Sequence, residues 1–370
     1  MKNIFSTLKL GSKQELTNRL AVAPMTTSQS YPDGTISEEE SLWIERLASD
    51  GFGLIITCAT AISKQSIGFR NQLSAGDDIM LPGLTQLAER LKSYKSKVVL
   101  QLCHAGSRAI PELAGGLAYS ASSYLLPQIP DFVPPQTLSK VQISEIIEDF
   151  AMACERVAKA GLAGIEFHGA NGFLFTQFIS TMTNQREDEY GGSLTNRARF
   201  AREVVQACRK RVPAGFIIGF RMSFESAGLE TGLDIDENIQ IVNWLAEDGI
   251  DYLHVSHLFY DAKSVKYPDK IALQYISERV TKDIPIVCAG GITSVGDANK
   301  ALEYGAGIVA IGRAAIGNIK LPEYFARGEE LPFKAPFSEE NLIKLGISND
   351  FLDYMKLPFI LQALNIIDVQ

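Results

Sequence analysis

Residues 284–313, IPIVCAGGITSVGDANKALEYGAGIVAIGR, contain a complete strand–helix–strand unit. One apolar run ends at the glycine pair Gly290 and Gly291, a helical stretch follows, and a second apolar run ends at Gly312 and Arg313. Runs that are apolar almost throughout are typical of strands buried on both faces, as in a parallel sheet. This stretch therefore predicts a parallel sheet whose strands are joined by covering helices.

The same alternation extends back through most of the chain. Further strands are expected at 18–24, 53–60, 98–103, 164–168, 216–223 and 252–257. Helices are expected at 37–51, 84–94, 144–160, 194–212, 236–249, 272–283 and 294–305. Eight strands in one continuous series favour an α/β fold of the closed (β/α)8 TIM-barrel type over an open doubly wound sheet.

The two ends of the chain depart from this alternation. We expect residues 1–17 to form an N-terminal cap, residues 1–335 to contain the whole barrel, and residues 336–370 to form a C-terminal helical extension. The apolar end of that extension, FILQALNII (359–367), should pack on the barrel or on a partner subunit, because such a patch is rarely exposed on a monomer. A homo-oligomer is compatible with this pattern.

Composition excludes several classes of protein. The chain has 370 residues, of which 46% are hydrophobic and 21% charged, which indicates a folded globular protein. Its net charge of −8 argues against a nucleic-acid partner. The five cysteines form no C-x-x-C pair, so we expect no zinc ribbon or iron–sulfur cluster. No signal peptide and no apolar run of about 18 residues is present, so we expect a cytoplasmic protein without a membrane partner.

Glycines follow the last two predicted strands. Such barrels carry their active sites at the carboxyl ends of the strands, often with a phosphate site after strands seven and eight. Gly290, Gly291, Gly312 and Arg313 fit that position, since backbone N–H groups can hold the phosphate and the arginine can add a contact. The alternative is that these glycines only make tight turns.

Two polar side chains interrupt apolar strands. Gln101 lies in VVLQLC and Arg221 in IIGFRMS, where burial without a partner would be costly. They could satisfy each other, or they could hydrogen-bond a polar heterocycle. Arg221, a permanent cation among apolar neighbours, is the stronger functional candidate. A lone buried glutamine is more often structural.

His168 and Asn171 close the fourth predicted strand in GIEFHGANGFL. A histidine and an asparagine across a short turn can direct two N–H donors at one substrate oxygen. A structural histidine is the alternative. His254 and His257 stand three residues apart on a strand and face opposite ways, so they cannot chelate one ion together, and we expect no metal site.

These segments resemble the Old Yellow Enzyme family of FMN-dependent NAD(P)H oxidoreductases, the ene-reductases. The resemblance covers about residues 1–330 in consistent order. Its matching segments are NRLAVAPMTT, VVLQLCHAGSR, IEFHGANGFL, TNQREDEYGGSLTNRARF, CAGGIT and IGRAAI. The block from Asn184 to Phe200, together with the His168 and Asn171 pair, is highly specific.

The resemblance implies that FMN lies across the strand ends. The residues that would contact its ring are Ala23, Pro24, Met25, Thr26 and Ala59. Gln101 and Arg221 match the groups that hold the pyrimidine side, and Arg221 would stabilise negative charge on the reduced ring. Gly290, Gly291, Gly312 and Arg313 match the phosphate site. His168 and Asn171 match the pair that grips the substrate carbonyl oxygen.

The implied reaction is ping-pong. NAD(P)H reduces the flavin and leaves, and an electron-poor alkene then takes hydride from flavin N5 at its β carbon. Many relatives have a tyrosine, the proton donor for the α carbon, where this chain has Phe173. We therefore expect the proton to come from water or another tyrosine such as Tyr190 in the substrate pocket, and the reduction to be slow or altered.

The stretch from Ser107 to Lys140 contains Tyr119, Tyr124 and several prolines and should form a lid over the flavin.

Two other functions stay open. One is a barrel aldolase or isomerase acting on a phosphorylated metabolite, which would need a lysine or paired carboxylates at strand ends; no predicted strand ends in lysine. The other is a non-catalytic flavin-binding protein, which Phe173 keeps possible.

Overall fold

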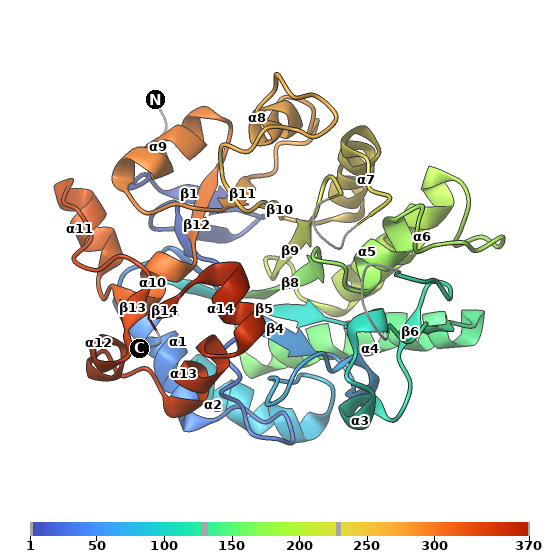
Figure 1. The fold of residues 1–370 in the computed structure, drawn as a ribbon, viewed down its shortest axis with the longest axis horizontal. Coiled ribbons are helices and arrows are strands. Elements are labelled where there is room, and N and C mark those ends of the chain that lie inside the picture. The colour runs from blue at the N-terminus through green and yellow to red at the C-terminus, as the bar shows by residue number, and fades with distance from the viewer. Residues whose placement is uncertain (1–2, 127–131, 227–230, 369–370) are drawn as a thin grey trace.

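Residues 3–126, 132–226 and 231–368 are described by a computed structural model (Figure 1). Eight parallel strands close into a barrel, with β12 pairing back to β3. In order around the barrel they are β3 (Leu20–Val22), β4 (Leu54–Ala61), β5 (Lys97–Cys103), β8 (Gly164–Gly169), β9 (Ile217–Met222), β10 (Tyr252–Ser256), β11 (Ile286–Ala289) and β12 (Ile308–Ile311). The predicted (β/α)8 barrel is confirmed.

Helices lie around the outside of the barrel (Figure 1). The larger ones are α1 (Glu38–Ser49), α2 (Leu81–Leu91), α4 (Lys140–Ala160), α6 (Leu194–Arg211), α7 (Ile235–Asp248) and α9 (Val295–Glu303). Helix α4 begins four residues before the predicted start, because Ser139 caps it and forms a capping box with Gln142. The helix predicted for 272–283 is the shorter α8 (Ala272–Ser277).

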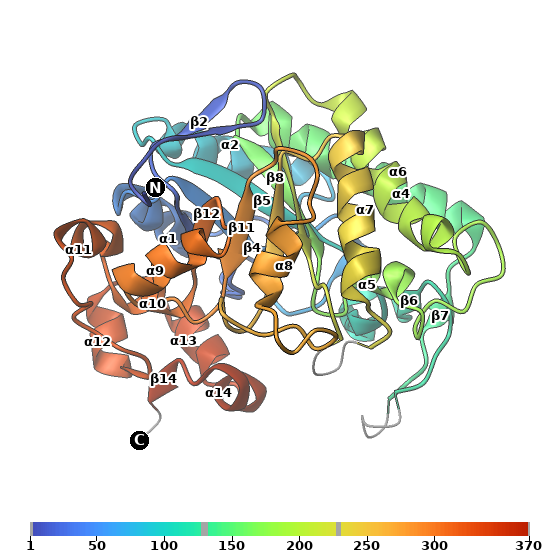
Figure 2. The same ribbon diagram turned by 90° about the horizontal axis from the view of Figure 1, so that it is seen from above.

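A hairpin of β1 (Leu8–Leu10) and β2 (Gln14–Leu16) closes the amino end of the barrel. Leu10 and Leu16 are fully buried in one cluster with Leu54 and Val99 from the barrel strands. The predicted N-terminal cap is therefore confirmed. In Figure 2 the hairpin and the C-terminal helices lie at opposite ends of the barrel. The hairpin therefore leaves the other end, where the strands have their carboxyl ends, available for a site.

The chain after β12 packs on its own barrel. Its elements are α10 (Arg313–Gly317), α11 (Leu321–Arg327), β13 (Phe337–Ser338), α12 (Glu339–Lys344), α13 (Asn349–Met355), α14 (Pro358–Leu364) and β14 (Ile367–Asp368). The ring of Phe351 lies edge-on to Trp43 of α1, with the ring centroids 5.3 Å apart. Within the apolar segment 359–367, Ile360 is buried but Phe359 is 62% exposed. The division of the chain at residue 335 stays a prediction.

Short elements complete the mouth of the barrel. They are the 3-10 turns Lys64–Ser66, Asp78–Met80 and Gly106–Arg108, the helices α3 (Pro111–Ala114) and α5 (Leu174–Ile179), and the strand pair β6 (Tyr119–Ser120) and β7 (Gln136–Thr137). Residues 127–131 of the predicted lid lie outside the described residues. Within the described ranges, no cluster of three acidic, histidine or cysteine side chains could hold a metal, and no helix is long and apolar enough to cross a membrane.

Candidate active site

A buried carboxylate organises the barrel interior below the mouth. Glu166 of β8 is fully buried, and its Oε1 accepts a hydrogen bond of 2.7 Å from Nε2 of Gln101 on β5. Its Oε2 accepts one of 3.0 Å from the Tyr252 hydroxyl and lies 2.9 Å from Nδ1 of His254, both on β10. We call these four residues the Glu166 network. Burial opposes ionisation, but His254, Arg221 and Gln101 together lower the pKa of Glu166 below its ordinary value.

His168 stands at the end of β8 in register with Arg221 on β9, which is in register with His254 on β10. Burial, and then the charge of Arg221, holds the pKa of His168 well below its ordinary value, so its imidazole is neutral at physiological pH. Its buried Nδ1 has no partner within the described part of the chain. A neutral ring with an unused polar atom at a barrel mouth suits hydrogen bonding to a ligand.

The loop after β8 brings Asn171 and Phe173 beside His168. Asn171 adopts a left-handed backbone with φ of 59°, which asparagine tolerates better than most residues. Its N–H donates to Ser223 Oγ at 3.2 Å, and its carbonyl accepts from Nη1 of Arg108 at 2.6 Å, so its backbone is fixed while the residue stays exposed. The rings of His168 and Phe173 are 4.5 Å apart.

The other predicted ring contacts meet at the ends of neighbouring strands. Ala23 donates its N–H to Ile311 at 3.0 Å, and a Cβ on Gly312 would lie 3.6 Å from the sulfur of Met25. Pro24 and Thr26 are half-buried in the same segment. Where β4 pairs with β5, a bulge in β4 between Ile56 and Ala59 places Ala59 opposite Gln101 of β5. Bulges of this kind often re-aim side chains beside active sites.

The C-terminal extension supplies a tyrosine to this mouth. Tyr354 of α13 is half-buried, and its hydroxyl lies close enough to Thr26, Arg108 and Cys58 for their polar groups to act on its pKa. Burial raises the pKa of Tyr354, so its phenol is protonated at neutral pH. The sequence offered no signal for this residue, because it is over 300 positions from Thr26 and lies on a short helix outside the barrel pattern.

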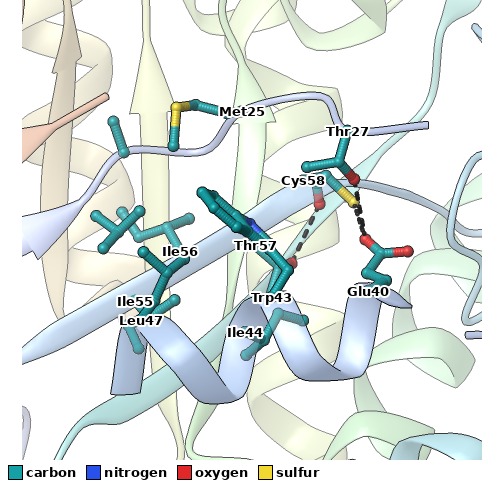
Figure 3. Close-up of a pocket in the computed structure, with 12 residues that line it drawn as sticks. Met25, Thr27, Glu40, Trp43, Ile44, Leu47, Ile55, Ile56, Thr57 and Cys58 are labelled. Carbon is teal, nitrogen blue, oxygen red and sulfur yellow. Dashed lines mark hydrogen bonds between the residues drawn. The ribbon is translucent and has the colours of Figure 1, made fainter. Parts of the chain in front are cut away.

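A small hollow behind the segment Met25–Thr27 contains a second buried carboxylate (Figure 3). The cavity has a volume of about 10 Å³, the size of one water molecule. Glu40 projects into it from α1 and accepts hydrogen bonds from Cys58 Sγ at 2.9 Å, from Thr27 Oγ1 at 3.5 Å and from the Ser30 hydroxyl. Burial raises the pKa of Glu40. These bonds tie the Thr26 segment to α1 and β4.

The glycines of the predicted phosphate site have structural reasons of their own. Gly290 has φ of 130°, and a Cβ there would lie 2.8 Å from the carbonyl of His257. A Cβ on Gly291, at φ of 65°, would lie 2.9 Å from the ring of Phe259. The tight-turn alternative therefore has support at both positions. Arg313 is exposed and donates to the carbonyl of Leu364 at 2.9 Å, and its phosphate contact stays a prediction.

The prediction that Tyr190 lies in the substrate pocket is wrong. Its hydroxyl donates to Glu203 of α6 at 2.8 Å, and its ring packs against Phe178 with the centroids 6.2 Å apart. Asn184 fixes the position by donating to the Tyr190 carbonyl at 2.7 Å. These contacts place Tyr190 in the layer between α5 and α6, where its hydroxyl is already bonded.

A larger cavity of about 300 Å³ lies beside the Asn171 loop. Its lining includes Arg108, Tyr124, Phe132, Gly172 and Gln177. The Tyr124 hydroxyl is 2.6 Å from Ser107 Oγ, and the guanidinium carbon of Arg108 is 5.2 Å from the Phe173 ring centroid. The described part of the predicted lid therefore borders the site loop, while the role of the lid stays a prediction.

Comparison with known proteins identifies the family. The profile of the NADH:flavin oxidoreductase / NADH oxidase family matches residues 3–331. NADH:fumarate oxidoreductase of Klebsiella pneumoniae is 33% identical over 339 residues, which are 89% of this chain but only 36% of that protein. A probable NADH-dependent flavin oxidoreductase of Bacillus subtilis is 33% identical over 319 residues, with 84% of both chains covered.

Among solved structures, morphinone reductase in complex with tetrahydroNAD is 28% identical with a TM-score of 0.79, and the match covers 94% of this chain and 97% of that one. This chain thus spans about a third of its first curated relative and nearly the whole of morphinone reductase. The resemblance to the Old Yellow Enzymes is confirmed. The chain belongs to the NADH:flavin oxidoreductase / NADH oxidase family.

Proposed function

We propose that this protein binds FMN and uses NADH or NADPH to reduce the activated C=C bond of a small molecule. The observation that carries the proposal is the mouth of the barrel. There His168 is neutral and buried, its Nδ1 has no partner among the described residues, and it stands beside Asn171 and next in register to the cation Arg221. When bound, the flavin supplies hydride transfer between the nicotinamide and the alkene.

The residues present fit a flavin. The Gln101 amide and the Arg221 guanidinium lie on the two strands that flank β8. Together they offer the polar, partly cationic edge that a pyrimidine ring needs. Ala23, Pro24, Met25 and Thr26 would lie under the ring, with Ala59 at its border. At the phosphate end, the backbone N–H groups of Gly291 and Gly312 would be the donors, with Gly290 shaping the turn and Arg313 adding a charge.

His168 and Asn171 would act on the substrate. Each can donate an N–H to the same carbonyl or nitro oxygen, which draws electrons from the β carbon and stabilises the charge that develops on the oxygen. Because the pKa of His168 is well below its ordinary value, it would donate as a neutral imidazole rather than as a cation.

The proton for the α carbon needs a donor other than residue 173, since phenylalanine has none. We assign this role to Tyr354, whose phenol lies near Thr26 at the barrel mouth and has a pKa raised by burial, so that it is protonated at neutral pH. The Tyr354 O–H bond would break as the new C–H bond forms, and solvent would return the proton. Phe173, whose ring lies tilted against that of His168, would then only shape the pocket.

The first test is spectroscopic. We expect the purified protein to show or take up a flavin with an absorption band near about 450 nm, to lose that band under NADH or NADPH without oxygen, and to regain it on addition of an enone. Fumarate belongs in the substrate panel because the Klebsiella relative is named for it. A colourless protein that takes up no FMN would overturn the proposal and favour the phosphorylated-metabolite barrel. Bleaching without reoxidation by any alkene would favour a flavin-binding or NADH-oxidising role.

A further inference from the structure

We propose that Glu166 is a positioning residue for the cofactor: its carboxylate fixes the Gln101 amide and offsets the charge of Arg221, and it thereby controls both the affinity for FMN and the reduction potential of the bound flavin. The inference rests on the proposed function. It concerns a side chain that the reaction itself does not use.

A glycine leaves the space that the Glu166 network needs inside the barrel. Gly219 on β9 is in register with Glu166 on one side and with Tyr252 on the other. A Cβ at Gly219 would lie 2.0 Å from Cζ of Tyr252, so the tyrosine ring occupies the space that any other residue would fill. The absent side chain is what lets the Tyr252 hydroxyl reach Glu166 across the intervening strand.

The orientation of Gln101 follows from the ionised state of Glu166. An ionised carboxylate only accepts hydrogen bonds, so Gln101 must turn its NH₂ group toward Oε1 of Glu166, as the 2.7 Å contact has it. The amide carbonyl then faces the other way and is left for a donor. The imide N–H of a flavin is such a donor. Without the carboxylate the amide could rotate by half a turn and present the wrong atom.

The charge of Glu166 has a second effect. Burial, followed by the charge of Arg221, holds the pKa of His168 well below its ordinary value, so that ring is neutral. Burial also lowers the pKa of His254, while Glu166 acts on it in the opposite direction. The charges of Glu166 and Arg221 interact in the barrel interior, since Arg221 helps to lower the pKa of Glu166. Charges in a low-dielectric interior interact far more strongly than in water. Removing the negative charge would leave Arg221 freer to stabilise the negative charge of a reduced cofactor.

The test compares variants that separate charge from hydrogen bonding. Glu166→Gln keeps the shape and removes the charge. We expect the equilibrium constant for flavin reduction to rise at least tenfold, which raises the midpoint potential of this two-electron couple by about 30 mV. Tyr252→Phe removes a hydrogen bond to the same carboxylate without changing its charge, and it is the matched control, with an expected change below threefold.

Glu166→Asp retains the charge but shortens its reach to Gln101. We expect titration of the apoprotein to show that FMN binds at least tenfold more weakly. The equilibrium constant for flavin reduction should change less than threefold. If Glu166→Gln does not fold, the Asp variant decides alone: unchanged FMN affinity would overturn the proposal. A Glu166→Gln protein that holds FMN at the wild-type potential would overturn it as well. Wild-type protein that binds no FMN would overturn the proposed function itself.

Discussion

His168 is a histidine that the fold prevents from taking up a proton. Burial and the charge of Arg221 act in the same direction on its pKa, and Arg108 and His254 add to the effect. A neutral ring can donate one hydrogen bond and accept another, but it cannot serve as a cationic acid. The donor strength of the site should therefore be constant across the physiological pH range.

Replacing His168 by alanine should slow alkene reduction about 10²- to 10³-fold, the usual cost of losing one oxyanion donor. The rate is measured as reoxidation of the reduced enzyme, with flavin content as the control for folding. In the wild type, this rate should show no ionisation near the ordinary histidine pKa of about 6.5. A rate that follows such an ionisation would show that His168 titrates and would contradict the assignment.

The tyrosine assignment is tested by moving the phenol. Tyr354→Phe should slow reoxidation by roughly 10²-fold, and Phe173→Tyr in that background should restore much of the loss, because a phenol would again be beside the substrate. Tyr124→Phe is the matched control, since Tyr124 is also a phenol of the mouth but is bonded to Ser107. Equal effects of the Tyr354 and Tyr124 changes would argue for water as the proton source.

Helix α13 connects the C-terminal extension to this chemistry. It carries Tyr354 to Thr26, and it is held by the Phe351 contact with Trp43 and by Ser348, whose hydroxyl donates to Gln29 at 2.5 Å. A helix of seven residues has little stability of its own. Its position must therefore come from these tertiary contacts.

We predict that Phe351→Ala lowers the free energy of unfolding by about 3–5 kcal/mol, because it empties a fully buried aromatic site. Phe359→Ala, in the neighbouring helix α14, should change it by less than about 0.5 kcal/mol, since that ring is 62% exposed. Urea unfolding followed by tryptophan fluorescence measures both. Comparable losses would mean that Phe359 is covered in solution, as a partner subunit would do.

The elements that could be predicted from the sequence are those with a local signal. Strands such as Leu54–Ala61 are buried along their whole length and appear as apolar runs, and Ser37 marks the start of α1 by capping it. The Glu166 network has no such signal, because its contacts join residues 65 and 86–88 positions apart. The position of Tyr190 depends on tertiary packing instead, because its ring contacts Phe178 of α5 and its hydroxyl bonds Glu203 of α6, and neither contact has a signal in the sequence pattern.

The whole molecule contains four histidines, and each has a lowered pKa in the folded state. Burial is the main cause in every case, and it lowers the pKa of His104 to about 3 and that of His257 to about 4. Glu40, Asp50 and Asp149 act in the opposite direction, because burial raises their pKa values. The histidines and these three carboxylates therefore shift the stability in opposite directions as the pH falls.

We predict that the histidine contribution to stability falls as the pH drops below about 6.5. In that range the unfolded chain binds protons on its histidines and the folded chain does not, so acid favours unfolding. His104→Gln stays neutral in both states. It should reduce the change in the free energy of unfolding between pH 5 and pH 6 by about 1.2 kcal/mol. Urea unfolding of both proteins at the two pH values measures this difference, in which the carboxylate contributions cancel. An unchanged slope would mean that His104 is protonated in the folded protein, which its buried Nε2, without a partner among the described residues, argues against.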